Sequence, residues 1–341
     1  MNQNSRRVTI QHIAEQLGIS KHSVSKALRG QTGVSQATRD QVLTTARQLG
    51  YALAPSPGES PDQPVVMLLL PRPTAVDTAV WPRILLGVQE ALQVRGATLT
   101  MATVSEEEQA TNTVPTALEH MPVAGVLCVG QLDPSYVACL RALGHALVLA
   151  DNHLPELEVD SVMSDDYSGS RSAVQHLVMM GHRRIGFIGN NYLAPGFHRR
   201  WMGYRDAMEE HGLRSSPEWS ILLSDPDEAP WGLGFPADRL RLCQDLPDAW
   251  VCVNDRTAHS LVRALNDMGL RVPDDASVIG FDDIDESVHF TPPLTTVRVY
   301  REALGARSVE RLYNRIAAPD APPDLTLIST RLTVRDSVGP L

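Results

Sequence analysis

Cysteine is scarce in this chain, and the sequence has no long uncharged apolar run. Its 341 residues include four cysteines, none of them in a C-x-x-C pair. Cys128 and Cys252 stand inside apolar, strand-like segments, which favours buried thiols over disulfides or a metal site. The opening residues MNQNSRRVT lack the apolar core of a signal peptide, and no segment is long enough for a membrane span. We therefore expect a cytoplasmic protein with no membrane partner.

Familiar catalytic motifs are also missing. The sequence contains no G-x-S-x-G nucleophile elbow, no Walker loop and no H-E-x-x-H metal pattern. Asp282 and Asp283 are adjacent carboxylates, but neighbouring residues at a strand end usually point in different directions. The sequence thus predicts no enzyme, no catalytic residue, no metal and no other cofactor.

Positive charge is concentrated near the N-terminal end. Residues 1–51 hold seven Lys or Arg and two acidic residues, a net charge of +5, whereas the remainder holds 23 bases and 38 acids, a net charge of −15. This segregation is typical of a small DNA-binding head on a larger acidic body. The body is long enough to divide into two lobes.

Residues 9–29 have the pattern of two short amphipathic helices around a turn at Gly18. Apolar or small residues recur at helical spacing on both sides of the turn, at Ile10, Ile13, Ala14, Leu17, Val24, Ala27 and Leu28. Thr9 and Ser20 are candidate N-caps. A helix that begins after Ser20 directs four polar side chains outward, those of Lys21, His22, Ser25 and Lys26. The pattern predicts a helix-turn-helix that enters the DNA major groove, although any amphipathic helical hairpin with a solvated basic face shows the same periodicity.

A third helix is expected after Ser35, which would cap it. Its inward residues are expected to be Ala37, Val42, Ala46 and Leu49. Thr38 and Arg39 fall in its first turn, near the position of a DNA phosphate. Four prolines between Pro55 and Pro64 then predict an extended linker over residues 52–64.

Residues 65–341 alternate between apolar, strand-like runs and amphipathic segments. The expected strands are 65–70, 98–103, 124–130, 146–151, 184–190, 220–224, 249–255 and 277–283. The expected helices are 83–96, a stretch near 110–120, another near 134–143, 168–181, 199–212 and 258–269. This alternation predicts two α/β lobes with parallel sheets and a ligand cleft near the carboxyl ends of the strands.

Pairs of polar residues follow several of the expected strands. They are Asp151 and Asn152, Asn190 and Asn191, Asn254 and Asp255, and Asp282 and Asp283. Carboxylates and amides suit a hydroxyl-rich ligand, but the same residue types also cap helices. Arg200 can bind a ligand oxygen, or it can form a surface salt bridge.

The chain resembles the lactose-repressor (LacI/GalR) family of bacterial transcription regulators. The motifs that carry the resemblance are TIQHIAEQLGISKHSVSKAL, VSQATRDQVLTTARQLGY, GHRRIGFIG, RRWMGYRDAM, GLRVPDDASVIGFDD and TPPLTTVR. The resemblance implies a helix-turn-helix head at residues 1–51 and a two-lobed body like a periplasmic sugar-binding protein at 65–341. It also implies a dimer on palindromic double-stranded operator DNA and a small effector of the sugar or nucleoside class.

The resemblance assigns roles to particular residues. The base-reading positions match Lys21, His22 and Lys26. The phosphate-facing or capping positions match Thr9, Ser20, Ser23, Ser25, Arg29, Ser35 and Thr38. The effector-binding positions match Asp151, Arg200, Trp231, Asn254 and Asp282.

The linker departs from the family pattern. Family members follow the tyrosine of the head with Y-x-P-N-x-x-A-x-x-L, which folds into a hinge helix on DNA, whereas Tyr51 is followed here by Leu53, Ala54, Pro57 and Ser60. Pro57 predicts that no such helix forms. A ligand-responsive regulator, with repression as the leading hypothesis, thus stands beside a cytoplasmic small-molecule sensor that binds DNA weakly or without specificity. The effector, the direction of its effect, and dimer or tetramer stay open.

Overall fold

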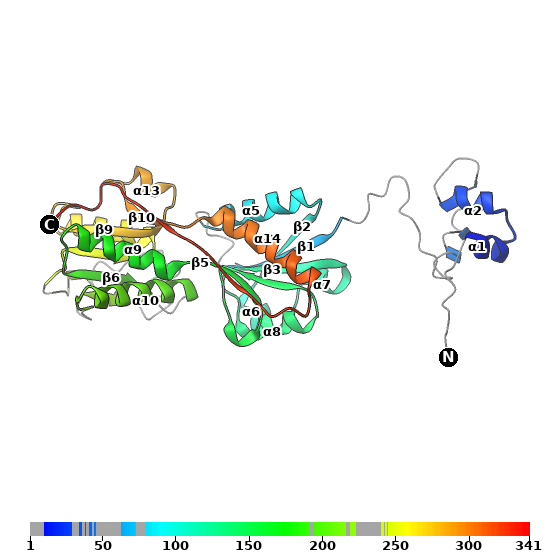
Figure 1. Cartoon of the computed structure of the whole chain (residues 1–341), viewed down its shortest axis with the longest axis horizontal. Coiled ribbons are helices and arrows are strands. Elements are labelled where there is room, and N and C mark those ends of the chain that lie inside the picture. Colours follow the sequence, from blue (N-terminus) through cyan, green and yellow to red (C-terminus); the bar gives the residue numbers. More distant parts are fainter. Residues whose placement is uncertain are drawn as a thin grey trace. The chain divides into compact units, whose positions relative to one another are not determined.

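The computed structural model describes residues 10–28, 34–35, 38, 41–42, 44–45, 63–72, 80–190, 194–215, 219–222, 240–241, 243 and 245–341. The chain divides into two compact units, Met1–Gln63 and Pro64–Leu341 (Figure 1). The predicted linker at 52–64 lies outside the described residues, apart from Gln63 and Pro64. The two units are therefore described one at a time.

The described part of the first unit includes the short helices α1 (Ile10–Leu17) and α2 (Lys21–Leu28). Gly18 between them has a φ of +65°, which glycine adopts without the strain of a side chain. The core of this unit consists of Ile13, Ala14, Val24, Ala27 and Val42, all buried. Of the expected third helix, Thr38, residues 41–42 and residues 44–45 are helical, while Ala37, Arg39, Ala46 and Leu49 lie outside the described residues.

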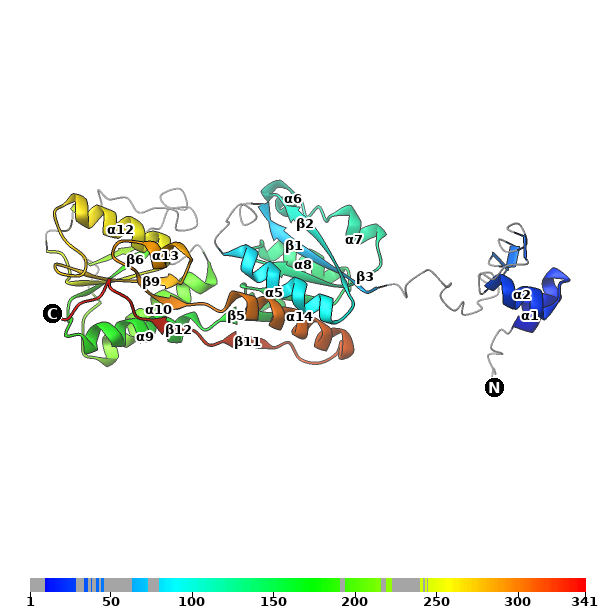
Figure 2. The same cartoon turned by 90° about the horizontal axis from the view of Figure 1, so that it is seen from above.

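The second unit has two lobes, each built around a six-stranded sheet (Figures 1 and 2). The sheet of the first lobe has the order β11-β5-β4-β3-β1-β2, with β1 (Val65–Pro71), β2 (Thr98–Val104), β3 (Val123–Val129), β4 (Leu147–Ala150), β5 (Asp160–Ser164) and β11 (Leu325–Ile328). The sheet of the second lobe has the order β12-β10-β9-β8-β6-β7, with β6 (Ile185–Gly189), β7 (Ser220–Leu222), β8 (Ala249–Cys252), β9 (Ser277–Asp282), β10 (Thr295–Arg298) and β12 (Arg331–Thr333).

Helices cover both faces of each sheet. Those of the first lobe are α5 (Trp81–Val94), α6 (Glu106–Ala110), α7 (Thr116–His120), α8 (Pro134–Ala142) and α14 (Arg301–Ala317), with a 3₁₀ turn at Pro155–Leu157. Those of the second lobe are α9 (Asp166–Met179), α10 (Pro195–Glu210), α12 (Asp255–Asp267) and α13 (Glu286–His289). This arrangement confirms the predicted two-lobed α/β body.

Burial on both faces explains the continuous apolar strands. In β1, Val66 and Leu68 pack in one cluster with residues of α5 and α14, whereas Met67 and Leu69 pack in another with residues of α8. The first cluster also requires α5 and α14 to approach closely (Figure 2). A Cβ on Gly87 would lie 2.0 Å from the carbonyl oxygen of Glu302, so this contact admits glycine alone.

The structure differs from the sequence-based expectations in three places. The stretch near 110–120 forms two short helices, α6 and α7, because Asn112 takes a left-handed φ of 53° and Pro115 precedes α7. β12 pairs with β10 in the antiparallel sense, so the second sheet is not wholly parallel. Four strands (β5, β10, β11 and β12) and two helices (α13 and α14) were not among the expected elements.

Within the described residues, the chain passes between the lobes three times. The passages lie between β5 and α9, between β10 and α14, and between β11 and β12. Two of them are joined by hydrogen bonds, because the amide of Asp165 donates to the carbonyl of Ile328 (2.8 Å) and the hydroxyl of Thr330 donates to the carbonyl of Asp165 (3.2 Å). These passages bring residues distant in sequence to the junction of the lobes.

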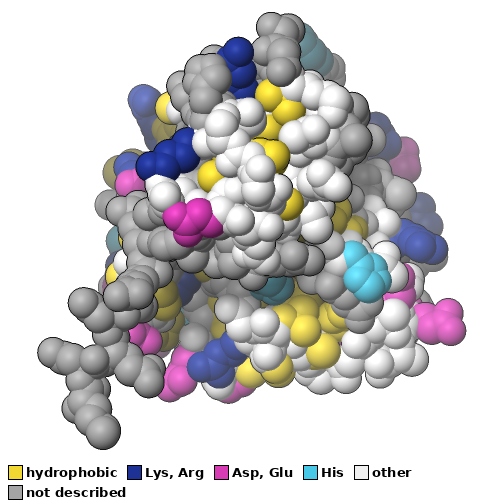
Figure 3. Space-filling view, turned by 90° about the vertical axis from the view of Figure 1, so that its right-hand side faces the viewer, with side chains coloured by type: hydrophobic (Ala, Val, Ile, Leu, Met, Phe, Trp, Pro, Cys, Tyr) yellow, Lys and Arg dark blue, Asp and Glu magenta, His cyan; other side chains and the backbone are white. Residues whose placement is uncertain are grey.

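Three further features concern the cysteines, the apolarity of the helices and the surface. Cys128 and Cys252 are fully buried, as expected, and none of the four cysteines forms a disulfide. Among the described helices, none combines the length and apolarity needed to cross a bilayer. Hydrophobic side chains reach the surface on the face seen in Figure 3, among charged side chains of both signs.

Candidate DNA interface and effector site

Helix α2 turns its polar side chains away from the core of the first unit. Val24 and Ala27 are buried on one side of the helix, while Lys21 is exposed at its first position and Lys26 is half-buried in its last turn. The side chains of His22 and Ser25 lie outside the part that the structure describes, as do Thr9 and Arg29 altogether. The described face of α2 therefore offers two ammonium groups to a negatively charged partner.

Serine hydroxyls cap two helical segments of the first unit, α2 and the segment that includes Thr38. The Oγ of Ser20 accepts the amide of Ser23 at 3.0 Å, and the two hydroxyls lie 2.9 Å apart. The Oγ of Ser35 accepts the amide of Thr38 at 3.2 Å. Such caps fix the start of a helix, where backbone amides can also receive a phosphate.

In the second unit, polar residues at the strand ends adopt unusual backbone conformations. Asp151 follows β4 with a φ of 57°, Asp282 ends β9 with a φ of 110°, and Asp283 has a φ of 55°. Residues other than glycine are uncommon at such angles, and the resulting strain tends to persist at functional sites. The two consecutive positive φ values aim Asp282 and Asp283 at different partners.

Arg200 lies at the centre of a charged cluster in the second lobe. Its Nε donates to Asp166 (2.8 Å), its Nη1 donates to the carbonyl of Val253 (2.7 Å), and its Nη2 lies 3.1 Å from Asp282. The guanidinium also stacks 3.8 Å from the ring centroid of Phe281. Arg200 is therefore a buried, fully engaged cation, and not the surface salt bridge that the sequence had left open.

Asp282 is held from a second side by Arg301, the first residue of α14. The Nη2 of Arg301 lies 3.3 Å from the Asp282 carboxylate, and its Nη1 donates to the Asp282 carbonyl at 3.0 Å. Arg301 belongs to the first lobe, so this contact joins the two lobes. The Asp282 side chain is thus held by two guanidinium groups of the protein itself.

Asp151 lies near this cluster but has no such support. Its backbone carbonyl accepts from Gln131 at 3.1 Å. Burial raises the pKa of Asp151 to about 7, with contributions from the negative charges of Asp166 and Asp282, although Arg200 and Arg301 act in the opposite direction. The Asp151 carboxylate therefore lies near the two guanidinium groups that hold Asp282, and near the carboxylates of Asp166 and Asp282.

Asn254 and Asp255 act in the folding of the second lobe. The Asn254 Oδ1 caps α12 by accepting the amide of Thr257 at 2.9 Å. Asp255 is fully buried and accepts from the hydroxyls of Thr296 (2.5 Å) and Ser287 (2.7 Å) and from the amide of Ile284 (2.9 Å). Burial, and then the charge of Asp282, raises the pKa of Asp255 to about 7. Asp255 thereby anchors the loop that carries Asp282.

The structure brings together three of the five effector residues expected from the sequence, namely Asp151, Arg200 and Asp282. Asn254 follows Val253, whose carbonyl binds Arg200, so it adjoins the same cluster. Trp231 lies outside the described residues. Sequence reasoning missed Asp166 and Arg301, which begin α9 and α14, two residues after the unpredicted strand β5 and three residues after the unpredicted strand β10.

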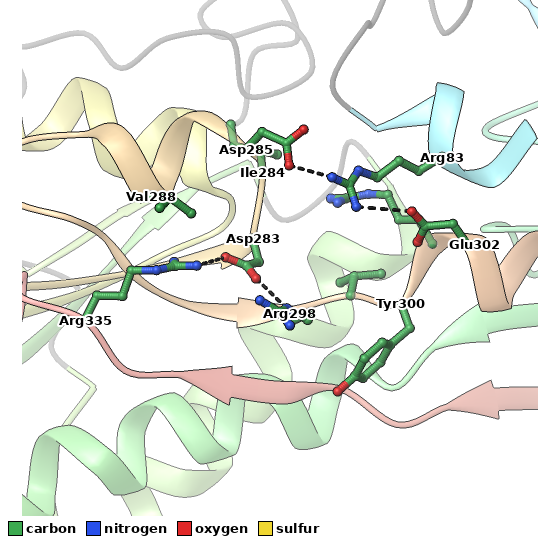
Figure 4. A pocket seen from close by; sticks show the side chains of 11 residues that line it. Arg83, Asp283, Ile284, Asp285, Val288, Arg298, Tyr300, Glu302 and Arg335 are labelled. Carbon is green, nitrogen blue, oxygen red and sulfur yellow. Dashed lines mark hydrogen bonds and ion pairs between the residues drawn. The ribbon is translucent and has the colours of Figure 1, made fainter. Parts of the chain in front are cut away.

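A pocket of about 300 Å³ opens at the junction of the lobes (Figure 4). Asp283 points into it and pairs with Arg298 and Arg335, each at 2.5 Å. Arg83 of α5 reaches across from the first lobe to Asp285 of the second at 2.5 Å, and it also contacts Glu302 at 3.1 Å. Consecutive aspartates thus serve two different sites, since Asp282 faces Arg200 while Asp283 faces this pocket.

These features define a class of protein. A helix-turn-helix unit with basic residues on its second helix, joined in one chain to a two-lobed body with a polar cluster at the strand ends, is the architecture of a ligand-responsive DNA-binding transcriptional regulator. Comparison with known proteins specifies the family. Residues 9–53 match the model of bacterial regulatory proteins of the lacI family, and residues 174–338 match a periplasmic binding protein-like domain.

Full-length relatives agree with these matches. The chain is 31% identical to the HTH-type transcriptional regulator MalR of Streptomyces coelicolor over 335 residues, covering 96% of this chain and 95% of that protein. Among solved structures, a transcriptional regulator CelR–cellobiose complex has 28% identity and a TM-score of 0.69, covering 97% and 100% of the two chains. The lac repressor dimer bound to operator and an anti-inducer has 22% identity and a TM-score of 0.71, covering 98% and 100%. The chain belongs to the LacI family of bacterial regulatory proteins, a family of transcriptional regulators, and these relatives give no support to the sensor alternative.

Proposed function

We propose that this protein represses transcription by binding a palindromic operator as a homodimer, and that a small hydroxylated effector in the second unit modulates that binding. The observation that carries the proposal is the presence, in one chain, of an outward basic face on α2 and of a charged cluster at strand ends that belongs to both lobes. Differential binding of the effector to two arrangements of the lobes would supply the free energy for the response.

The proposed DNA contacts divide into two kinds. Base edges in the major groove are read by Lys21, His22 and Lys26. Contacts to phosphates, or caps that position them, are made by Thr9, Ser20, Ser23, Ser25, Arg29, Ser35 and Thr38. The exposure of Lys21 and the caps at Ser20 and Ser35 support this division.

The proposed effector is a sugar or nucleoside, bound by Asp151, Arg200, Trp231, Asn254 and Asp282. The cluster presents carboxylate acceptors and guanidinium donors at fixed positions, which suits a molecule with several hydroxyl groups. The cellobiose in the CelR complex is such a molecule. Because the chain belongs to a family of transcriptional regulators, we infer that the effector is bound and released unchanged.

Exposed apolar residues support the proposed homodimer. Leu86 and Val94 on α5 are 47% and 86% exposed, and Met101 on the neighbouring edge strand β2 is 48% exposed. Exposed apolar groups on adjacent elements are typical of protein interfaces. A dimer with twofold symmetry would place two first units on two half-sites, in keeping with the dimeric lac repressor structure. Such a protein would act in the cytoplasm, where the operator is.

Fluorescence anisotropy with labelled duplexes tests the proposal. The full-length protein should bind DNA from upstream of its own gene at least about 10³-fold more tightly than a shuffled duplex, and the affinity should fall steeply with salt. Lys26→Ala should weaken binding and reduce the preference for the upstream sequence. Equal affinity for the two duplexes would contradict the proposal and favour the sensor.

A further inference from the structure

The charges of the effector cluster do not balance. Three carboxylates, those of Asp151, Asp166 and Asp282, face two guanidinium groups, those of Arg200 and Arg301. Both guanidinium groups are already bound within the protein: Arg200 to Asp166, Asp282 and a backbone carbonyl, and Arg301 to the carboxylate and carbonyl of Asp282. The cluster therefore carries an excess negative charge and has no uncommitted cation of its own.

Asp151 is the carboxylate that no cation pairs, and it carries the excess charge when it is ionised, above its pKa of about 7. Asp166 accepts from Arg200 and from the hydroxyl of Ser164 (2.9 Å), and Asp282 contacts both arginines. The Asp151 carboxylate, by contrast, has no hydrogen bond or ion pair with any residue that the structure describes. Its left-handed backbone (φ 57°) is held by the bond from Gln131 to its carbonyl and by the bond from its own amide to the carbonyl of Val162 (2.9 Å). A half-buried carboxylate of this kind can accept hydrogen bonds from hydroxyl or amino groups of a ligand.

We propose that Asp151 determines the charge of the effector: it accepts hydroxyl or amino donors of the ligand and excludes ligands that carry a carboxylate or a phosphate. The proposal rests on the proposed function, since it names the chemical class that the effector site takes. A donor on the ligand would satisfy Asp151, whereas a second anion would add to an uncompensated negative charge in a partly desolvated site. Exclusion of this kind contributes to specificity as much as attraction does.

Arg199 is a nearby cation that could bind an acidic ligand and so remove the preference for neutral ligands. It precedes Arg200 on α10, is half-buried, and has a buried Nε without a hydrogen-bond partner. Its charge contributes, after burial, to the lowered pKa of His153 in the first lobe. Arg199 is thus a cation near the cluster with which the anion of an acidic ligand could pair. Arg199 therefore enters the test as a separate variant.

Matched ligands provide the test. Thermal-shift assays and then calorimetric titrations of the full chain would use D-glucose, D-glucosamine, D-glucuronate and glucose 6-phosphate, with the equivalent derivatives of galactose and ribose. We expect binding only by neutral and amino members, with the acidic derivative of a binding sugar at least about 100-fold weaker. In Asp151→Asn this gap, the difference in affinity between a neutral sugar and its acidic derivative, should narrow to less than about 10-fold, because the amide carries no charge. Asp320→Asn, at an exposed residue of the first lobe, should leave the gap unchanged.

The outcomes separate this inference from the proposed function. A uronate or phosphate that binds the wild-type protein as tightly as its neutral parent would overturn the selection by Asp151, and loss of that binding in Arg199→Gln would identify the cation responsible. An unchanged gap in Asp151→Asn would overturn it as well. Absence of binding by every member of the series would overturn the proposed effector class itself, and this inference with it.

Discussion

The two lobes contribute to the effector cluster in different ways. The second lobe supplies Arg200, Asp166 and Asp282, which are buried and joined to one another and to Arg301 by ion pairs. The first lobe supplies Arg301, which contacts Asp282, and Asp151, whose carboxylate has no partner among the described residues. Asp151 follows β4 and Asp282 ends β9, both with a positive φ, yet the Asp282 carboxylate is paired and the Asp151 carboxylate is not.

This difference separates stability from recognition. Buried ion pairs in the second lobe fix the positions of the side chains, and breaking them leaves charges uncompensated in the interior. The unpaired carboxylate of the first lobe costs stability when it ionises but remains available to a ligand. The lobes can therefore be compared through variants that remove one charge at a time.

Arg200→Met should have the largest effect, because it removes the shared partner of Asp166 and Asp282. We expect the free energy of unfolding to fall by about 3–5 kcal/mol, the usual consequence of leaving buried carboxylates unpaired. Urea denaturation followed by circular dichroism measures this change. Arg171→Met, which breaks an exposed pair with Glu210 in the same lobe, is the matched control and should have little effect. Similar losses for both variants would erase the distinction between buried and exposed pairs.

Gly280→Ala should be the next most disruptive change. A Cβ at this position of β9 would lie 2.2 Å from the Asp255 Oδ1, so the carboxylate that anchors the loop of Asp282 would have to move. Overpacking of this kind costs about 1–3 kcal/mol. Unfolding in urea gives the magnitude, and wild-type stability in the variant would show that the Asp255 network is not rigid.

Asp151→Asn tests the first lobe through pH. An aspartate whose pKa rises from its ordinary value near 4 to about 7 on folding binds a proton more tightly in the folded state. The contribution of Asp151 to wild-type stability therefore falls as the pH rises from about 4 to 7 and then stops falling, whereas the variant lacks this contribution. Above pH 7 the variant should be more stable by about 1–2 kcal/mol. Parallel stability curves for the two proteins between pH 4 and 8 would contradict the uncompensated burial of Asp151.

Arg83→Gln should have the smallest effect on stability. Arg83 joins the lobes through Asp285 at the pocket of Figure 4, but both partners are largely exposed. Exposed pairs contribute about 0.2–1 kcal/mol. A loss comparable to that of Arg200→Met would show that the contact at the pocket, and not the buried cluster, holds the lobes together.

Much of the architecture could be predicted from local sequence. The run VVMLLL specifies a strand buried on both faces, and Ser20 with Gly18 specifies the turn between α1 and α2. Strand β5 escaped prediction because it carries Asp160 and two serines at buried positions. The Asp160 carboxylate is tolerated there because Arg311 and Arg315 of α14, some 150 residues later, neutralise it. Local periodicity contains no trace of such a partner.

The cluster itself was only partly predictable. Polar residues after β4, β8 and β9 drew attention to Asp151, Asn254 and Asp282, but nothing local showed that Asn254 caps a helix while Asp151 stays unpaired. Asp166 and Arg301 follow strands that end at the passages between lobes. Their roles depend on three separate segments meeting, which only the fold determines. The helical pattern of α14, by contrast, was present in the sequence and could have been found.

Coupling between the two units can be measured in one titration. The full-length protein would be titrated into labelled upstream duplex with and without a saturating neutral sugar chosen by thermal shift. We predict that the ligand changes the dissociation constant for this duplex at least about 5-fold, while binding to a shuffled duplex is unaffected. An unchanged dissociation constant with a ligand that demonstrably binds would contradict a ligand-responsive regulator.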